Sequence, residues 1–308
     1  MRRLIIVLAT FAAGATGVGF TTHWLLTNEP DRNGVVVGAT ESIGGDGGRK
    51  AAVTGAKARP LDAPGLRRAV RAYVGQRPGK AGVMATDLRT GLSFGENEAG
   101  DFVSASVMKV DILASLLLQR QRERPGVGTG IGLSAGEREL AGQMIRESDN
   151  SAADALYSKA GNSSGVEKSN KRLGLTDTTP YPMSWGSSWT SPADQVRLLT
   201  TLVSERSPLA APGRGYVLGL MGSVLDEQAW GVSAAARPGE KVALKNGWTP
   251  VYHQGHGWAV NSVGRITGGG HDFLVAVCSG GSPTMEAGVA TVEHVADQVV
   301  GALRAAGP

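Results

Sequence analysis

A serine and a lysine three positions apart are the first residues here whose types and spacing suggest catalysis. Ser106 and Lys109 begin a stretch that is predicted to be helical to about Gln121. Residues three apart share a helix face, so the Lys109 amine can reach the Ser106 hydroxyl. That hydroxyl becomes a good nucleophile only when a base removes its proton, and a lysine is such a base only when its pKa is lowered. Taken alone, the pair is more typical of a helix N-cap followed by a solvated lysine than of a catalytic site.

Two later triplets complete a pattern with Ser106 and Lys109. Ser148-Asp149-Asn150 follows a predicted helix, and Lys245-Asn246-Gly247 ends an apolar strand. Ser-x-x-Lys, Ser-Asp-Asn and Lys-Thr-Gly, in this order, are the signature of penicillin-binding proteins and class A β-lactamases. From about residue 63 to the end, the sequence resembles that superfamily. It is most similar to actinobacterial exported serine hydrolases related to the class A enzymes.

The resemblance assigns a role to each matching residue. It implies that Ser106 is acylated, that Lys109 is its base, and that Ser148 relays a proton to the leaving nitrogen. Asn150 would hold the substrate amide, and Lys245 would bind the substrate carboxylate and polarise Ser148.

The resemblance also implies an oxyanion hole. The backbone N–H groups of Ser106 and Trp248 would stabilise the tetrahedral intermediate. Gly247 belongs to the same substrate-binding segment, and Asp149 is expected to be structural.

Two departures from the family pattern affect the expected activity. Asn246 stands where Thr or Ser is usual, and we expect its amide to donate to substrate with a different reach. Class A enzymes carry a deacylating glutamate on a loop before the helix that here begins near Ser191, yet residues 178–190 contain no Glu or Asp. The separation of Ser106 from Ser148 is also short for class A. We therefore expect acylation to be faster than deacylation.

Three other motifs have simpler explanations. Gly132-Leu133-Ser134-Ala135-Gly136 fits a nucleophile elbow, but Ser134 followed by Glu137 predicts a helix capping box. His253 and His256 lack a third metal ligand, so a solvated hairpin is expected and no metal site. Cys278 follows an apolar run and is expected to be a buried core thiol.

Tryptophans accompany these motifs. Trp185, Trp189 and Trp248 are candidates to line the substrate cleft, although core packing explains most tryptophans.

The elements that must position these residues follow from hydrophobic periodicity. Leu66, Val70, Tyr73 and Val74 predict a first helix. Strands are predicted at 83–88, 92–95, 241–245, 257–267 and 273–279, and further helices at 136–147, 151–160, 165–173, 192–204, 212–224 and 284–305. With strands at both ends and helices between, the fold class is α/β (α+β): a five-stranded antiparallel sheet flanked by helices, plus a helical subdomain.

Three segments divide the chain. Residues 1–26 are predicted to be a signal anchor or signal peptide, because Arg2 and Arg3 precede Leu4 to Leu26, which contains no charged residue. An uncleaved anchor with its N-terminus in the cytoplasm is favoured. Residues 27–62 are predicted to be a flexible linker, and residues 63–308 the β-lactamase-like domain. The enzyme is thus expected to be extracytoplasmic, anchored or secreted.

Composition excludes several classes of protein. Glycine is abundant, at 45 of 308 residues, without a collagen period. The net charge of +4, without a basic run, gives no support for nucleic-acid binding. One cysteine excludes an intrachain disulfide framework.

The predicted activity is serine acyl transfer without a metal or organic cofactor, in a chain expected to be a monomer. The expected substrate is an amide next to a carboxylate, as in a β-lactam or a peptidoglycan stem peptide. The alternatives are a D-Ala-D-Ala carboxypeptidase and a catalytically quiet cell-wall-binding module on the same fold.

Overall fold

The computed structural model describes residues 59–123, 130–252 and 256–306. The chain divides into Met1–Gly55 and Ala56–Pro308. The predicted anchor and nearly all of the predicted linker therefore lie outside the described residues. Within the described ranges, no helix has both the length and the apolar character to cross a membrane.

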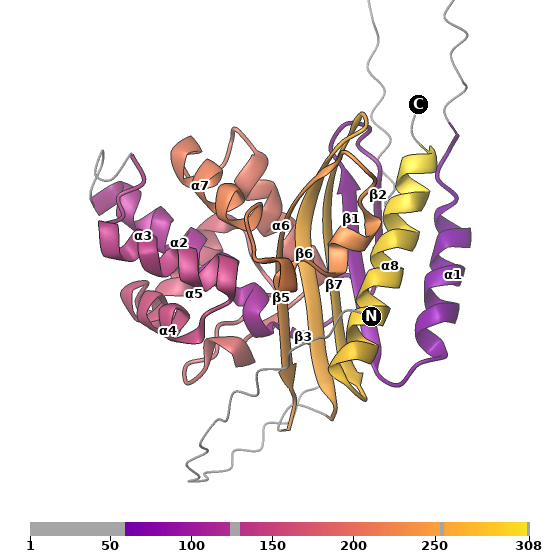
Figure 1. The fold of residues 1–308 in the computed structure, drawn as a ribbon, viewed down its shortest axis with the longest axis horizontal. Coiled ribbons are helices and arrows are strands. Elements are labelled where there is room, and N and C mark those ends of the chain that lie inside the picture. Colours follow the sequence, from indigo (N-terminus) through magenta and orange to yellow (C-terminus); the bar gives the residue numbers. More distant parts are fainter. Residues whose placement is uncertain (1–58, 124–129, 253–255, 307–308) are drawn as a thin grey trace, which may run out of the picture. The chain divides into compact units, whose positions relative to one another are not determined.

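One antiparallel sheet organises the described part of the chain (Figure 1). Its five strands lie in the order β2-β1-β7-β6-β5. This arrangement confirms the predicted sheet, with both chain ends contributing strands. The bounds are β1 (Lys80–Asp87), β2 (Ser93–Glu96), β5 (Lys241–Pro250), β6 (Trp258–Gly268) and β7 (His271–Ser282).

Two helices cover one face of the sheet. α1 (Ala63–Gly75) and α8 (Met285–Ala306) lie together beyond the sheet in Figure 1. Leu66 and Val70 of α1 and a row of valines on α8 share one buried cluster with apolar side chains of the strands. The predicted apolar spacing of the first helix therefore gives its buried side.

The other face carries the helical part of the molecule (Figure 1). Its central element is α2 (Met108–Glu123), in which every residue from Met108 to Leu118 is buried. A second apolar cluster joins α2 to its neighbours and to Val263, Leu274 and Ala276 of the sheet. The neighbours are α3 (Ala135–Gly142), α4 (Asn150–Lys159), α5 (Asn162–Leu173), α6 (Pro192–Val203) and α7 (Ala211–Met221).

Side-chain caps fix where several of these helices begin. Asp62, Asp149 and Ser191 accept hydrogen bonds from backbone N–H groups in the first turns of α1, α4 and α6. Ser134 and Glu137 form the predicted capping box of α3, so the elbow-like motif has a structural explanation. Each such cap contributes about 1 kcal/mol.

Short elements account for the differences from the predicted boundaries. The helix predicted over 136–147 is α3 followed by a π-helical turn, η2 (Gln143–Glu147). A two-residue pair, β3 (Phe102–Val103) with β4 (Trp189–Thr190), was not predicted because such short strands have no readable periodicity. The remaining short helices are η1 (Ala105–Val107), η3 (Trp185–Ser187), η4 (Asp226–Gln228) and η5 (Gly231–Ala235).

Candidate active site

Ser106 lies at the point where β3 leads into α2. It is in the middle of η1, half-buried, and follows Ala105, whose φ of +46° is in the left-handed region. Such backbone strain persists only where the surroundings enforce it, and it is common at functional sites. Among the residues that the structure describes, the Ser106 hydroxyl has no hydrogen-bond partner.

Gly247 brings the edge strand β5 against Ser106. A Cβ on Gly247 would lie 2.6 Å from the Ser106 nitrogen and 2.7 Å from the Val107 nitrogen. Those neighbours are backbone atoms of a buried turn and cannot move aside. Glycine is therefore required here because the two backbones approach so closely.

Lys109 is fully buried one turn further along α2. Its Nζ donates to the Ser148 carbonyl at 2.6 Å, to Ser148 Oγ at 3.1 Å and to Asn150 Oδ1 at 2.8 Å. Burial lowers the pKa of Lys109 to about 7, although Asp149 and Asp154 oppose the shift. Three acceptors match the three protons of an ammonium group. With a pKa of about 7, part of the Lys109 population is the free amine near neutral pH.

Ser148 lies at the junction between η2 and α4. Its φ of +59° and ψ of +33° are left-handed, so the chain turns sharply and Asp149 can cap α4. The Ser148 hydroxyl accepts from Lys245 Nζ at 2.9 Å as well as from Lys109. The first two sequence motifs and the lysine of the third thus meet at one oxygen atom.

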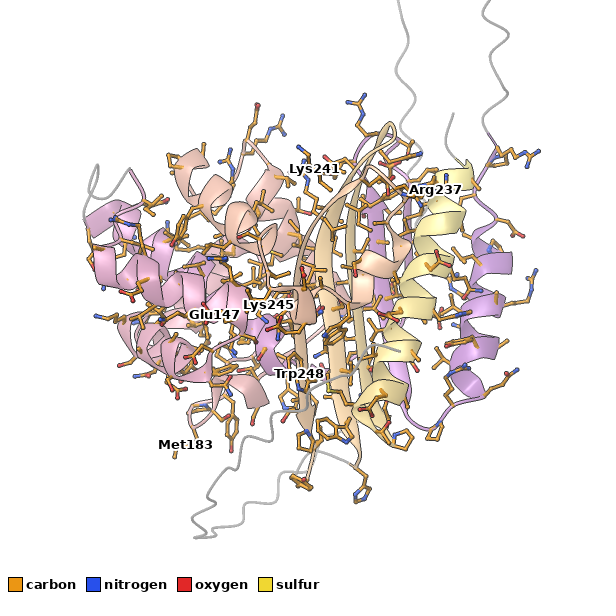
Figure 2. The ribbon with its side chains drawn as sticks, viewed as in Figure 1. Glu147, Met183, Arg237, Lys241, Lys245 and Trp248 are labelled. Atoms are coloured by element: carbon orange, nitrogen blue, oxygen red, sulfur yellow. The ribbon has the colours of Figure 1, made fainter. Side chains whose placement is uncertain are left out.

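Lys245 approaches from the opposite side of the site, from β5 (Figure 2). It is 1% exposed, and its Nζ also donates to the Asn246 carbonyl at 2.8 Å. Burial, and then the positive charge of Lys109, hold the pKa of Lys245 well below its ordinary value. A negatively charged group that arrives here would offset the mutual repulsion of the two lysines.

Asn246 corrects one expectation. Its side chain does not face Ser106, because adjacent residues of a strand point to opposite faces and Lys245 and Gly247 take the side toward α2. The Asn246 amide instead donates to the carbonyl groups of Gln228, at 2.7 Å, and Trp230, at 2.9 Å, behind the sheet. The expectation that this amide donates directly to substrate is therefore wrong.

The Trp248 N–H faces the open edge of the sheet. Across the hairpin, Val251 N donates to Gly257 O, so the odd-numbered residues of this strand direct their N–H groups toward β6. Even-numbered residues point outward, and Pro250, which has no N–H, is one of them. The Trp248 ring packs behind the sheet against Trp230, with ring centroids 5.8 Å apart.

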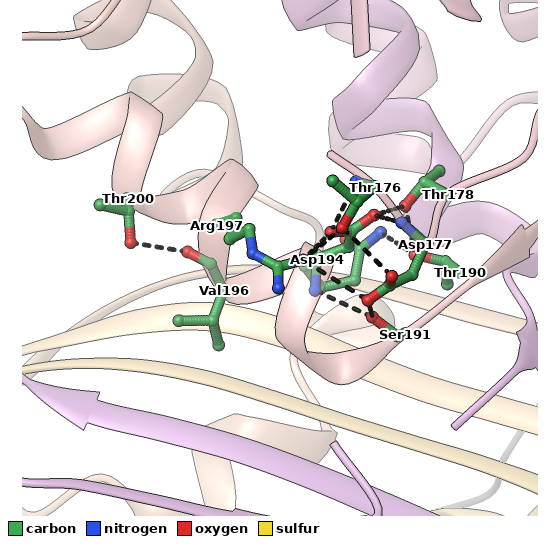
Figure 3. A network of polar contacts seen from close by, with 10 residues as sticks. Thr176, Asp177, Thr178, Thr190, Ser191, Asp194, Val196, Arg197 and Thr200 are labelled. Carbon is green, nitrogen blue, oxygen red and sulfur yellow. Dashed lines mark hydrogen bonds and ion pairs between the residues drawn. The ribbon is translucent and has the colours of Figure 1, made fainter. Parts of the chain in front are cut away.

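The segment between α5 and α6 forms another side of the site. Polar contacts hold its two ends together (Figure 3). Asp194 accepts from Thr176 N, Asp177 N and Thr178 Oγ1. Asp177 accepts from Ser191 Oγ and pairs with Arg197, which also pairs with Asp194. Both carboxylates at the base of this segment are thus engaged in holding it closed.

Three further residues lie at the site outside the motifs. Trp185, a sequence candidate for lining the cleft, places its ring centroid 4.8 Å from Lys109 Nζ, and Asp154 accepts from Trp185 Nε1 at 2.6 Å. Asn261 donates to the Val103 and Ser104 carbonyls, which fixes β6 to the turn before Ser106. Asp154 and Asn261 were not predicted from the sequence. The available signal was for Asp154, which is four positions after Asn150 and so lies on the same face of α4.

The remaining candidates in the described part of the chain make no hydrogen bond to Ser106 or to the two lysines. Burial raises the pKa of the Cys278 thiol to about 12, so it is the inert core residue that was predicted. Trp189 packs against Val103, Val251 and Ala259. His253 lies outside the described residues, and within the described ranges no group of His, Cys, Asp and Glu could hold a metal ion.

Two cavities in the described part of the chain are also separate from this site. One, of about 470 Å³, lies between α7 and the strands β5 and β6; the other, of about 440 Å³, lies beside α3. Neither is lined by a residue of the three motifs.

This fold, in which two buried lysines donate to one serine hydroxyl, is typical of one class of serine hydrolase. The sequence profile of the Beta-lactamase2 family, described as a beta-lactamase enzyme family, matches residues 65–303. The chain belongs to this family and is a serine hydrolase of the β-lactamase type. No curated protein matches it in sequence.

Solved structures share the fold at low sequence identity. PBP-A, in a variant described as an acyl-enzyme complex with penicillin G, matches 80% of this chain and 98% of its own, with 21% identity and a TM-score of 0.66. The TLA-1 extended-spectrum β-lactamase matches 78% and 99%, with 19% identity and a TM-score of 0.67. The class A β-lactamase from Mycobacterium abscessus matches 78% and 99%, with 22% identity and a TM-score of 0.65.

Proposed function

We propose that this chain is an exported serine hydrolase that forms an acyl-enzyme on Ser106 with β-lactams or related amides and releases the acyl group slowly. The observation that carries the proposal is the convergence of Lys109 and Lys245 on Ser148 Oγ, at 3.1 and 2.9 Å. Export rests on the charged and apolar pattern of residues 1–26.

Acylation begins with the Ser106 proton. With its pKa lowered by burial to about 7, Lys109 is partly a free amine at neutral pH and accepts that proton. Ser106 Oγ then bonds to the substrate carbonyl carbon. The N–H groups of Ser106 and Trp248 stabilise the oxyanion, each donor contributing about 3–4 kcal/mol in the transition state.

Release of the leaving nitrogen requires a proton on it. Ser148 Oγ accepts hydrogen bonds from both lysines, which occupy its two lone pairs and leave its own O–H directed outward. Ser148 donates that proton to the nitrogen as the carbon–nitrogen bond breaks. Lys245 pairs with the substrate carboxylate, which offsets the cost of two buried positive charges, and the exposed Asn150 side chain holds the substrate amide.

Deacylation is the slow step in this proposal. Water that attacks the ester needs a general base, and residues 178–190 contain no carboxylate. The carboxylates at the base of that segment, Asp177 and Asp194, are engaged with backbone N–H groups, hydroxyls and Arg197. Loss of general-base assistance lengthens the life of an acyl-enzyme by about 10²–10⁴-fold.

Hydrolysis of a peptidoglycan D-Ala-D-Ala stem peptide is the second candidate activity. The missing deacylating carboxylate favours it over rapid β-lactam hydrolysis, and the same residues would bind the terminal carboxylate of such a peptide.

Intact-protein mass spectrometry tests the proposal. The purified full chain is incubated with penicillin G and, separately, with a fluorophosphonate. Wild type should gain one adduct and Ser106→Ala none, while Ser134→Ala should behave as wild type. An adduct that persists in Ser106→Ala contradicts the assignment.

A rate measurement tests the order of the two steps. Hydrolysis of a chromogenic cephalosporin should show a burst near one equivalent followed by a slow linear phase. Rapid turnover without an accumulating adduct contradicts slow deacylation.

A reporter fusion tests export. Residues 1–62 fused to a reporter that works only after export should give activity, and deletion of residues 2–26 should abolish it. A fusion that stays in the cytosol contradicts the export proposal.

A further inference from the structure

The contact between Trp185 and Lys109 is the feature that catalysis as described does not use. Trp185 is half-exposed, whereas Lys109 beneath it is 0% exposed. The ring centroid lies 4.8 Å from Nζ, which is within the range of a cation–π contact. One face of the indole therefore covers the catalytic amine while other parts of the ring meet solvent.

Several hydrogen bonds hold Trp185 in this place. Its Nε1 donates to Asp154 Oδ1 at 2.6 Å. Its carbonyl accepts from Ser104 Oγ at 3.5 Å, and Ser104 N donates to Ser188 O at 2.8 Å. The indole is therefore fixed both to α4 and to the turn that carries the nucleophile.

The two ends of the 178–190 segment are also fixed, by the contacts of Figure 3. Thr178 and Thr190 join their hydroxyls at 2.9 Å, and Tyr157 donates to the carbonyl of Tyr181 at 3.1 Å. Trp185 thus lies on a braced loop, and its side chain leaves Lys109 only when the hydrogen bond to Asp154 and the cation–π contact are broken.

We propose that Trp185, held by Asp154, is a positioning residue that keeps water away from Lys109 and from the ester on Ser106, and so sets the lifetime of the acyl-enzyme. The inference rests on the proposed function and extends it. Hydrolysis adds the oxygen of water to the ester carbon, breaks the bond from that carbon to Ser106 Oγ, and returns a proton from water to Oγ. Lys109 is the base that the proposed function assigns to Ser106, and the indole covers its buried amine on one side.

Two variants separate the ring from the charge beside it. Trp185→Ala removes the cover and the cation–π contact together. Burial is the main cause of the depressed pKa of Lys109, so its relief outweighs the loss of the cation–π contact and that pKa rises. Asp154→Asn keeps an acceptor for Nε1 but removes a negative charge that raises the pKa of Lys109, so that pKa falls. The acid limb of the acylation rate, where Lys109 becomes protonated, should therefore move to higher pH in the first variant and to lower pH in the second.

The lifetime of the adduct gives the second readout. The full chain is acylated with penicillin G, excess drug is removed, and the adduct is followed by intact mass. Trp185→Ala should shorten the lifetime by about 10- to 100-fold, part of the gain that a working general base gives. Trp185→Phe keeps a ring but loses the hydrogen bond to Asp154, and should fall between Ala and wild type. Met183→Ala is the matched control, because Met183 is on the same loop and is 86% exposed.

The outcomes separate this inference from the proposed function. Equal lifetimes in wild type and Trp185→Ala overturn it, as do shortened lifetimes with an acid limb that moves in neither variant. If Trp185→Ala does not fold, the adduct lifetime in Trp185→Phe and the acid limb in Asp154→Asn decide instead. An unchanged lifetime in the first or an unmoved limb in the second overturns the inference. A wild type that forms no adduct on Ser106 contradicts the proposed function itself.

Discussion

The side of the site that carries Lys109, Ser148 and Lys245 differs from the side formed by residues 178–190 in what its polar groups do. On the first side, two buried lysines direct their amines at one hydroxyl. On the second side, the carboxylates of Asp177 and Asp194 accept the hydrogen bonds that close the loop. Buried charged groups, such as the two lysines, lower the free energy of unfolding when their charge is not fully compensated. The carboxylates at the base of the loop accept local hydrogen bonds, which offset the free-energy cost of their burial.

This contrast accounts for the expected imbalance between the two halves of the reaction. In the proposed reaction, acylation uses the lysine side, where every required group is present and both lysines are buried. Deacylation would use the loop side, where Trp185 stands over Lys109. The two sides can therefore be changed separately: changes on the lysine side should slow the reaction, and changes on the loop side should shorten the life of the acyl-enzyme.

Removing Lys109 should give the largest effect. Lys109→Met keeps most of the length and the apolar character of the stem but removes the base, so acylation by penicillin G should slow by about 10²–10⁴-fold. Because a methionine suits this buried helix, unfolding should be unchanged or slightly shifted to higher temperature. Stopped-flow acylation and thermal melts measure the two effects.

Lys171→Met is the control for Lys109→Met, since Lys171 is an exposed lysine paired only with Glu167 on α5. Acylation at the wild-type rate in Lys109→Met would mean that another group removes the Ser106 proton.

Breaking the closure of the loop should give the next largest effect. Asp194 is fully buried and accepts from two backbone N–H groups and one hydroxyl of residues 176–178. Asp194→Ala leaves the two part-buried N–H groups without their acceptor, while Thr178 Oγ1 keeps its partner Thr190 Oγ1. A buried donor left unpaired costs about 1–3 kcal/mol. The free energy of unfolding should fall by about 3 kcal/mol, and the acyl-enzyme should lose lifetime because the loop no longer holds Trp185.

Chemical denaturation and intact mass measure these two effects of Asp194→Ala. An exposed carboxylate, Glu205 just after α6, provides the control as Glu205→Ala. A destabilised variant with an unaltered adduct lifetime would show that loop closure and deacylation are independent.

Asp111 connects the two sides and gives a pH-dependent test. It is buried on α2, accepts from Asn170 Nδ2 at 3.0 Å and Ser115 Oγ at 3.2 Å, and is repelled by Asp194. Burial raises the pKa of Asp111 to about 7 from an ordinary value of 3.8. The folded state therefore binds this proton more tightly than the unfolded state, and the stabilisation is lost as pH rises from about 4 to 7.

Asp111→Asn should remove that pH dependence. The free energy of unfolding of wild type should fall by a few kcal/mol between about pH 4 and pH 7 relative to the variant. Urea denaturation at intervals of one pH unit measures the difference. Asp226→Asn, at an exposed position in η4, should retain the wild-type profile. Parallel profiles for wild type and Asp111→Asn would mean that Asp111 is charged in the fold.

The sequence predicted the elements and motif residues that have regular spacing or a family pattern. The five strands, the helix that follows Ser106 and the Ser134 cap are of this kind. It could not predict contacts made between segments far apart in the chain. Trp185 over Lys109 and Asn261 at the Ser104 carbonyl join residues with no periodic relation. The direction of Asn246 was mistaken because a motif gives residue types in order, whereas strand alternation decides which face each side chain takes.

Asn246→Ala should give the smallest effect. It tests the lysine side through contacts on the face of the sheet away from α2. Its Nδ2 donates to the carbonyls of Gln228 and Trp230, and Trp230 packs against Trp248. Asn246→Ala leaves two buried carbonyls without a donor, so the free energy of unfolding should fall by about 2 kcal/mol. That corresponds to roughly 4–8 °C in melting temperature for a domain of this size.

The effect of Asn246→Ala on catalysis should be to slow both steps slightly. The side chain does not touch substrate, but the segment that it holds supports the backbone of Gly247 and Trp248, so a small displacement would move an oxyanion donor. Acylation should slow by about 3- to 10-fold, well below the loss for a missing donor. Because the same donor stabilises the oxyanion of deacylation, the lifetime of the adduct should lengthen and not shorten. Thr249→Ala, at a half-buried position on the same strand, is the control. A shortened lifetime, as expected for changes to the loop, would mean that the two sides of the site are not separable through β5.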